Sequence, residues 1–261
     1  LIEIPNEIRK LKKLKYLDLF ENNLMQLPKE IGKLTNLNHL DVGCNQIDML
    51  PKEFEKLTKL QMISLYNNQL KILPEVFKNL KDLTKLDLSC NEIEAIPNEL
   101  YELENLNVLI ASNNNISFIS KQIENLSKLT ELELANNHIK ELPQEIGNLT
   151  KLIKLDLAEN QINQFPKGIE KLKNLEIIEF RKNQLSKVPS EIKQLRNLKR
   201  LDLSKNNLIK LPKEIVELNL VISSDEFDLD DYDINIYDNP MSEEYKNILL
   251  SHDKELILKY Y

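Results

Sequence analysis

Aliphatic residues recur along the chain at fixed intervals, and polar residues separate them. Aligned on a repeated asparagine, one unit reads L-x-x-L-x-L-x-x-N-x-L-x-x-L-P-x-E-I-x-x-L-x-x and returns every 23 residues. A period of about 20 to 50 residues is typical of solenoids, in which each unit packs only against its neighbours. The repeated asparagines are Asn22, Asn45, Asn68, Asn91, Asn114, Asn137, Asn160, Asn183 and Asn206.

The two halves of each unit predict different elements. Leu17 and Leu19 alternate as a short strand requires, so the intervening positions, Tyr16, Asp18 and Phe20, should face the other way. In the L-P-x-E-I half, proline suits the first helical position and glutamate the positive end, so one or two turns of α- or 3₁₀-helix should follow. We therefore predict an α/β horseshoe with a parallel sheet on the concave face and short helices on the bulkier convex face.

The repeated asparagine should lie at the turn after each strand. Its amide both donates and accepts, so stacked asparagines can pair with backbone groups that the turn leaves free, forming a ladder along the solenoid. Loss of one rung should cost roughly 1 to 3 kcal/mol, because buried polar groups lose their partners.

The regular repeat ends near residue 217. Residues 1–217 should form the solenoid, as a partial first repeat and nine 23-residue steps, and residues 218–261 an irregular last repeat with a helical cap. Val221 keeps the repeat spacing, but ten inserted residues precede the next L-x-L-x-x-N motif at residues 234–239. Closing the open end of the core is a requirement of every solenoid.

The expected cap begins at Ser242, a good N-cap residue followed by two glutamates. Tyr245, Ile248, Leu249 and Leu256 should give the helix an apolar side that covers the last repeat.

The insertion at residues 225–233 carries six carboxylates, a composition that suggests calcium. An EF-hand loop starting at Asp228 would need glycine at its sixth position and glutamate at its twelfth, where this chain has Asp233 and Asn239. The spacing therefore disfavours an EF-hand, and whether the loop binds a metal ion stays open. We expect no metal site and no cofactor elsewhere.

Composition narrows the class of protein. A net charge of -7 disfavours a nucleic-acid surface, which draws affinity from neutralised phosphates, and no apolar run of about 18 residues predicts membrane insertion. Cys44 and Cys90 lie two repeats apart, roughly 10 Å by strand spacing, so both should be free thiols. Residues 1–5 match residues 24–28, so the chain opens inside a repeat and further residues are expected upstream.

No catalytic set can be assembled from the sequence. The histidines, His39, His138 and His252, lie in distant repeats or in the terminal helix. An acidic residue holds the middle exposed position of most strands, a regularity that indicates a role in the framework. We therefore expect no enzyme activity. These acidic residues are Asp18, Asp41, Asp87, Glu133, Asp156, Glu179 and Asp202.

The motif L-x-x-L-x-L-x-x-N-x-L-x-x-L-P-x-E-I-x-x-L, repeated over residues 1 to about 218, makes the chain resemble leucine-rich-repeat proteins. The 23-residue step resembles repeat scaffolds of the Ras pathway and exported leucine-rich-repeat proteins of pathogenic spirochaetes, and the Lys- and Asn-rich composition favours the latter. That resemblance implies a secreted or surface-exposed bacterial module that binds host proteins. A cytoplasmic signalling scaffold is the alternative. The repeat domain of a bacterial effector enzyme is disfavoured, because no catalytic domain accompanies the repeats.

The positions that vary on the expected concave face indicate where a protein ligand would bind. Aromatic and apolar side chains gather in the first three repeats, charged ones dominate the later repeats, and one repeat that lacks the usual proline, with Ser120 instead, adds two aliphatic residues. Exposed apolar groups on a concave surface usually mean a partner, although upstream repeats could also cover them. The oligomeric state is not predicted. The expected contact residues are Tyr16, Phe20, His39, Met62, Tyr66, Val108, Ile110, Lys154, Arg181 and Arg200.

Overall fold

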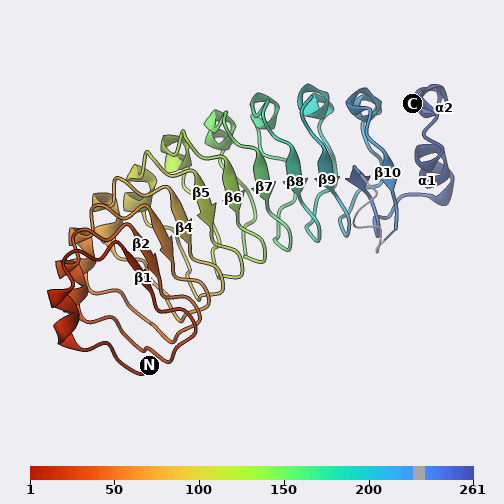
Figure 1. Ribbon diagram of the computed structural model, residues 1–261. Helices are drawn as coiled ribbons and strands as arrows, with labels where there is room; N and C mark the ends of the chain where they lie inside the picture. The colour runs from red at the N-terminus through yellow and green to blue at the C-terminus, as the bar shows by residue number, and fades with distance from the viewer. Residues whose placement is uncertain (226–232) are drawn as a thin grey trace.

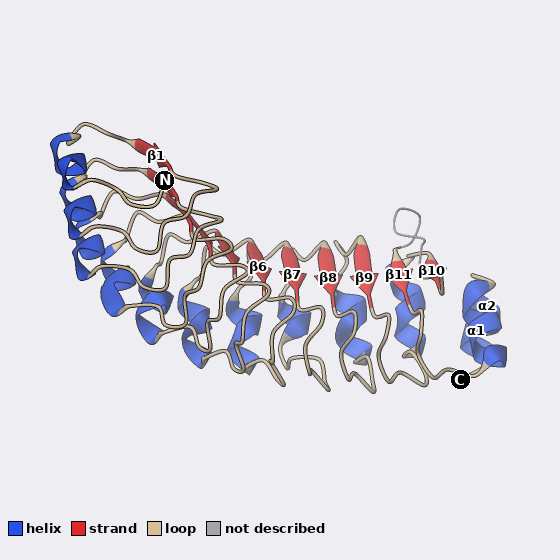
Figure 2. Ribbon diagram, turned by 90° about the horizontal axis from the view of Figure 1, so that it is seen from below, coloured by secondary structure: helices blue, strands red, loops and turns tan. Residues whose placement is uncertain are grey.

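The computed structural model describes residues 1–225 and 233–261 of the chain. They form one curved solenoid with strands along the inner side of the arc and short helices along the outer side (Figure 1 and Figure 2). The predicted horseshoe is confirmed. Most of the acidic insertion, residues 226–232, lies outside the described residues, and with it the question of a calcium loop.

The concave face is a parallel sheet of three-residue strands that pair in register. Tyr16 lies opposite His39, and His39 opposite Met62, so equivalent positions of successive repeats become neighbours across the sheet. The strands that follow the repeat are β1 (Tyr16–Asp18), β2 (His39–Asp41), β3 (Met62–Ser64), β4 (Lys85–Asp87), β5 (Val108–Ile110), β6 (Glu131–Glu133), β7 (Lys154–Asp156), β8 (Ile177–Glu179) and β9 (Arg200–Asp202).

The convex helices are all 3₁₀ helices among the described residues. A span of five residues closes easily with i to i+3 hydrogen bonds, such as Leu34 N–H to Ile31 O (3.0 Å). Pro28 precedes that helix with φ −68°, and it has no N–H to leave unpaired. The helices are η1 (Asn6–Lys10), η2 (Lys29–Lys33), η3 (Lys52–Lys56), η4 (Glu75–Asn79), η5 (Asn98–Glu102), η6 (Lys121–Asn125), η7 (Gln144–Asn148), η8 (Ile169–Lys171), η9 (Ser190–Gln194) and η10 (Lys213–Leu218).

The repeated asparagines connect successive turns. Asn45 Nδ2 donates to Leu19 O of the preceding repeat (2.9 Å), and Asn45 Oδ1 accepts from Leu24 N–H of that repeat (2.9 Å). Each asparagine therefore satisfies two backbone groups of the repeat before it. The same pair of bonds recurs at Asn68, Asn91, Asn114, Asn137, Asn160, Asn183, Asn206 and, beyond the insertion, Asn239.

The last part of the sheet departs from simple repetition. β11 (Ile234–Asn235) pairs with β9, and β10 (Ile222–Ser223), which comes earlier in the chain, lies outside β11 at the edge. Val221 keeps the repeat spacing, but its side chain is 45% exposed because β11 takes the next place in the stack. Although Val221 keeps the repeat spacing, its side chain therefore does not join the core.

Two α-helices, α1 (Glu243–Leu250) and α2 (Lys254–Lys259), cover the last repeat (Figure 1). Ser242 Oγ accepts a hydrogen bond from Tyr245 N–H (3.2 Å), and the Tyr245 hydroxyl accepts one from Leu211 N–H (3.1 Å). Tyr245 is buried. We propose that residues 218–261 close the apolar end of the solenoid.

One expected cap residue is wrong. Leu256 is exposed, and Ile257 is buried instead. The helix ends at Leu250 and His252 adopts a left-handed conformation (φ 55°), so α2 starts in a new phase and a different residue faces the core.

Candidate functional site

The concave face of the first three repeats carries large side chains that solvent reaches. Tyr16 on β1 is 59% exposed and Met62 on β3 is 38% exposed. Phe20 and Tyr66, which follow β1 and β3, are also exposed. They extend from strands whose central residues are held by the core, so the backbone fixes their spacing.

A shallow depression of about 290 Å³ lies between these side chains. The Tyr16 and His39 rings form one wall, with their centroids 5.7 Å apart, and Met62 forms another. Ser64 lines the depression where the neighbouring strands carry aspartate, so a smaller side chain occupies that position. The structure thus brings Tyr16, His39 and Met62 together. The residues around it are Tyr16, His39, Leu40, Asp41, Met62, Ile63, Ser64, Lys85 and Asp87.

Phe20 and Tyr66 occupy equivalent positions just after β1 and β3, and the repeat between them has glycine there. Gly43 separates them, and a Cβ atom added to it would lie 3.1 Å from the Phe20 ring, so glycine leaves room for that ring. The charge of the neighbouring Cys90, followed by its hydrogen bond, raises the pKa of Tyr66. A tyrosine hydroxyl is protonated at neutral pH even with its ordinary pKa, so this phenol can donate a hydrogen bond. Cys44 and Cys90 are free thiols.

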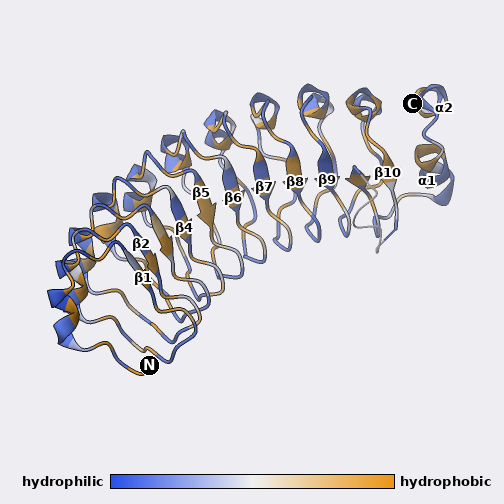
Figure 3. Ribbon diagram, viewed as in Figure 1, coloured by the Kyte–Doolittle hydropathy of each residue, from blue (hydrophilic) through white to orange (hydrophobic). Residues whose placement is uncertain are grey.

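The middle of the concave face is aliphatic. Val108 and Ile110 are half-buried on β5, and β5 is hydrophobic where β6 and β9 are largely hydrophilic (Figure 3). Ile110 occupies the position that holds an acidic residue in β4 and β6. The aliphatic pair therefore separates the aromatic end of the sheet from the charged end.

The charged end consists mainly of ion pairs. Lys154 on β7 pairs with Glu131 (3.4 Å) and with Glu133. The Arg200 guanidinium on β9 lies 2.9 Å from a Glu179 carboxylate oxygen. Arg181 lies half-buried just after β8. These ion pairs are partly buried and already neutralised within the sheet, so this end offers charge pattern more than adhesive area.

Glu179 is the most perturbed carboxyl group of the charged end. Burial, opposed by the Arg200 charge, raises the pKa of Glu179 to about 7. Asp202 and Asp156 nearby raise it further. The protonation state of this side chain therefore changes near neutral pH.

The aspartates at the acidic positions of the strands accept hydrogen bonds from the backbone. Asp41 Oδ1 accepts from Gly43 N–H (2.8 Å), and Asp87 Oδ1 accepts from Ser89 N–H (2.9 Å). Asp156 makes the equivalent bond to Ala158 N–H (3.0 Å). The aspartates of the row therefore have a structural reason in the turn that follows their strands, whereas Glu133 and Glu179 pair with Lys154 and Arg200. In residues 1–225 and 233–261, no group of three His, Cys, Asp or Glu side chains is arranged to hold a metal ion.

Sequence reasoning missed a second exposed surface. In four successive repeats the position two residues before the convex proline, or before Ser120 in the fourth, is apolar and exposed: Met49, Ile72, Ala95 and Phe118. We call this set the lateral row, because it lies on the side of the solenoid between the ladder turns and the convex helices. The signal in the sequence was its persistence over four repeats, followed by Glu141 at the same position.

Comparison with known proteins identifies the repeat. A family model described as leucine-rich repeat region matches residues 4–118 and 113–184, and a leucine-rich-repeat model matches residues 197–218. The chain belongs to the leucine-rich-repeat family. Such proteins are typically non-catalytic binding modules.

Solved structures agree with this assignment. A leucine-rich-repeat protein of Leptospira interrogans is 37% identical with a TM-score of 0.89; the match covers 97% of this chain and 62% of that one. The InlJ functional domain of Listeria monocytogenes is 22% identical with a TM-score of 0.77; the match covers 95% of this chain and 50% of that one. At this identity the likeness supports the fold alone. The plant peptide hormone receptor RGFR1, in complex with RGF2, is 29% identical with a TM-score of 0.68, covering 88% and 41%.

This leucine-rich-repeat chain thus spans less than two thirds of the length of the spirochaete relative. None of the curated proteins matches it. Among the described residues, no helix has both the length and the apolar character needed to cross a membrane.

Proposed function

We propose that this leucine-rich-repeat chain is a non-enzymatic module that binds a protein through its concave face. The observation that carries the proposal is the cluster of exposed Tyr16, Phe20, Met62 and Tyr66 on one end of that face. Aromatic side chains bury large areas and lose little conformational freedom on binding, so they dominate the energy of interfaces. The depression beside His39 would receive a protruding side chain of the partner.

The charged half of the face has a different role in this proposal. Lys154, Arg181 and Arg200 would orient the partner and exclude wrong ones, because complementary charge controls specificity and association rate more than affinity. Val108 and Ile110 would connect the two halves through an aliphatic strip.

The partner we propose is a host protein, and the chain would act as an exported or surface factor of a bacterium. The 37% identity to a Leptospira interrogans leucine-rich-repeat protein supports a bacterial origin. The plant receptor in complex with RGF2 supports the use of this fold for a polypeptide ligand.

The experiment compares two double variants of the concave face. Once host surface proteins have been screened and a partner purified, calorimetric titration at fixed salt should show that Phe20→Ala with Tyr66→Ala weakens binding at least about tenfold more than Lys154→Ala with Arg181→Ala. Raising the salt concentration should weaken binding modestly, in proportion to the charged contacts.

A matched control keeps the comparison fair. Ile209→Ala removes an exposed apolar side chain from outside the concave face and should leave the affinity unchanged. The opposite ranking of the two double variants would move the binding site to the charged half and defeat the proposal of aromatic anchors.

A further inference from the structure

The repeat does not require apolar residues at the exposed positions of the lateral row (Met49, Ile72, Ala95 and Phe118). Ile72 is 78% exposed, Met49 63% and Phe118 54%. In the four later repeats the same position holds Glu141, Gln164, Lys187 and Lys210, so the fold accepts polar residues there. A contiguous exposed apolar patch on a soluble protein usually marks an interaction site.

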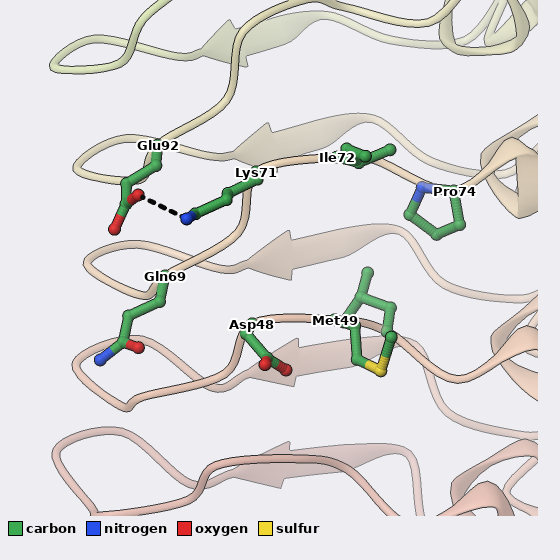
Figure 4. Close-up of a pocket in the computed structure, with 8 residues that line it drawn as sticks. Asp48, Met49, Gln69, Lys71, Ile72, Pro74 and Glu92 are labelled. Atoms are coloured by element: carbon green, nitrogen blue, oxygen red, sulfur yellow. Dashed lines mark ion pairs between the residues drawn. The ribbon is translucent and has the colours of Figure 1, made fainter.

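The row borders a depression of about 530 Å³ on the side of the solenoid. Figure 4 shows Met49 and Ile72 extending from neighbouring loops, with Pro74 beside Ile72. At the other end, the Lys71 ammonium lies 3.5 Å from a Glu92 carboxylate oxygen. The surface therefore combines an apolar strip with a charged border.

The border has an order that restricts what can cover it. The exposed residues immediately before Met49, Ile72, Ala95 and Phe118 are Asp48, Lys71, Glu94 and Ser117. Read along the solenoid, the charges are negative, positive, negative and neutral. The centre of this order is complementary to its own reversal, because Lys71 and Glu94 exchange places when the direction is inverted, and at the ends Asp48 meets the uncharged Ser117.

A second copy of the chain fits this order in one orientation. A two-fold axis between the repeats of Ile72 and Ala95 would set the solenoids antiparallel, with Ile72 opposite Ala95 of the second copy and Met49 opposite Phe118. Lys71 would then face Glu94 of the second copy, twice by symmetry. A parallel arrangement, with the two-fold axis along the row, would place the two charged borders at opposite edges of the interface, so Lys71 and Glu94 would find no partner in the second copy.

We propose that the lateral row is the interface of an antiparallel homodimer of this chain. The concave faces of both copies stay open in such a dimer. In each repeat the strand of the concave face comes before the ladder turn, and the lateral row comes after it. The dimer would therefore present two concave faces at once, and binding to a partner that displays several copies of its epitope would gain avidity. Failure of this proposal leaves the proposed function of the concave face untouched.

The first test is the mass of the full chain by sedimentation equilibrium between about 1 and 100 µM, a range that detects micromolar association. We expect a monomer–dimer equilibrium, which Ile72→Asp weakens at least about tenfold. Ile209→Asp is the matched control. Ile209 is likewise an exposed isoleucine (69%), but it lies outside the lateral row. Its change should leave the monomer–dimer equilibrium as in the parent.

The second test uses charge exchange between chains. Lys71→Glu and Glu94→Lys should each prevent homodimers, because like charges then face each other twice. Mixed in equal amounts, the two variants should associate about as tightly as the parent, because each interface pair again joins a positive and a negative side chain. An effect confined to one chain cannot be rescued by mixing, and circular dichroism verifies that each variant is folded.

Several outcomes would overturn the proposal. These are a parent protein that stays monomeric throughout the range, a dimer that Ile72→Asp leaves intact, and a mixture of the two charge variants that stays monomeric. A dimer that Phe20→Ala with Tyr66→Ala abolishes, while Ile72→Asp does not, would place self-association on the concave face instead.

Discussion

At the scale of single residues, one amide per repeat connects the turns. Asn114 is buried; it donates to Leu88 O (3.0 Å) and Ala111 O (3.1 Å) and accepts from Ile93 N–H (3.0 Å). Asn114→Ala should lower the free energy of unfolding by roughly 1 to 3 kcal/mol, because buried backbone groups lose their partners. Urea denaturation measures it. The neighbouring Asn115→Ala, on an exposed side chain, is the control, and an unchanged midpoint for Asn114→Ala would contradict a stabilising ladder.

Glu179 predicts a pH dependence of stability. Burial, despite the nearby Arg200 charge, raises its pKa to about 7 from an ordinary value of 4.5, so the folded state holds this proton more tightly than the unfolded state. The contribution of Glu179 to stability is therefore present at low pH and is lost as the pH rises from 4.5 through 7. Relative to the parent, Glu179→Gln should gain on the order of 1 to 3 kcal/mol between about pH 5 and pH 8.

Denaturation of both proteins across this pH range measures the gain, with the exposed Glu141→Gln as control. Parallel stability curves for the parent and Glu179→Gln would show that the carboxyl group titrates at an ordinary value. The sequence predicted the acidic row itself, because the row follows the repeat. It could not predict which member is perturbed, since that depends on burial and on Arg200 from the neighbouring strand.

At the scale of elements, the repeat without proline acquires an explanation. Tyr101 stands where the second repeat has Gly32, and its side chain is buried beneath the start of η6. Burial raises the pKa of Tyr101 to about 12, and the Ser120 backbone N–H acts in the opposite direction. A proline at residue 120 would have no N–H to offer. The Tyr101 hydroxyl is buried and makes no hydrogen bond among the described residues, so the Ser120 N–H, which proline would lack, is a polar neighbour rather than a bonded partner.

A double-mutant cycle tests this pairing. Ser120 already has φ −68° and ψ 150°, so proline fits its backbone. In a Tyr101→Phe background Ser120→Pro should be close to neutral, because a gain of about 0.4 to 1 kcal/mol from a stiffer unfolded chain is offset by loss of the hydrogen bond from Gln122 N–H to Ser120 Oγ (3.4 Å). In the parent background the same change should be less favourable by at most about 1 kcal/mol, because the buried hydroxyl loses a polar neighbour to which it is not hydrogen-bonded. Thermal or urea unfolding of the four proteins gives the coupling. Equal effects of Ser120→Pro in both backgrounds would mean that Tyr101 and Ser120 are independent.

The elements themselves followed from the hydrophobic period, and the exceptions mark where the period breaks. Strand positions and convex helices could be predicted because every unit repeats the same core leucines. The type of helix could not be predicted, since a span of about five residues can form either an α-helical or a 3₁₀ turn. Val221 and Leu256 depart from their spacing for one physical reason: the chain leaves its phase before each of them, at Asn219 and at His252, which both adopt a left-handed conformation. Spacing carries information only while the backbone conformation that produces it continues.

At the scale of the whole molecule, the two ends of the stack decide its stability. Truncation after Leu218 should expose Leu211 and Ile215, lower the urea midpoint and promote aggregation, because the last repeat loses β11, α1 and α2. In the full chain, Tyr245→Ala should cost about 3 kcal/mol, as large buried side chains do, whereas the exposed Glu244→Ala should have little effect. A truncated chain as stable and as soluble as the parent would show that residues 219–261 are no cap.

The two candidate surfaces differ in how far the sequence could reveal them. The concave positions were identifiable because a strand alternates, so every second residue faces the ligand side, and aromatic residues there stand out. The lateral row lies in loop segments without such alternation, where an exposed methionine or isoleucine looks like an isolated surface residue. Only the stacking of four repeats brings Met49, Ile72, Ala95 and Phe118 into one surface.

The direction of the asparagine ladder has a consequence for how the molecule is made. Because Asn45 satisfies backbone groups of the repeat before it, every turn depends on the repeat that follows it in the chain. A ribosome delivers the N-terminus first, so each newly emerged turn exposes an unpaired N–H until one more repeat arrives, while its carbonyl has only the asparagine of its own repeat as donor. The nascent chain is therefore always incomplete at its growing end, and synthesis of Asn239 supplies the last of these missing partners.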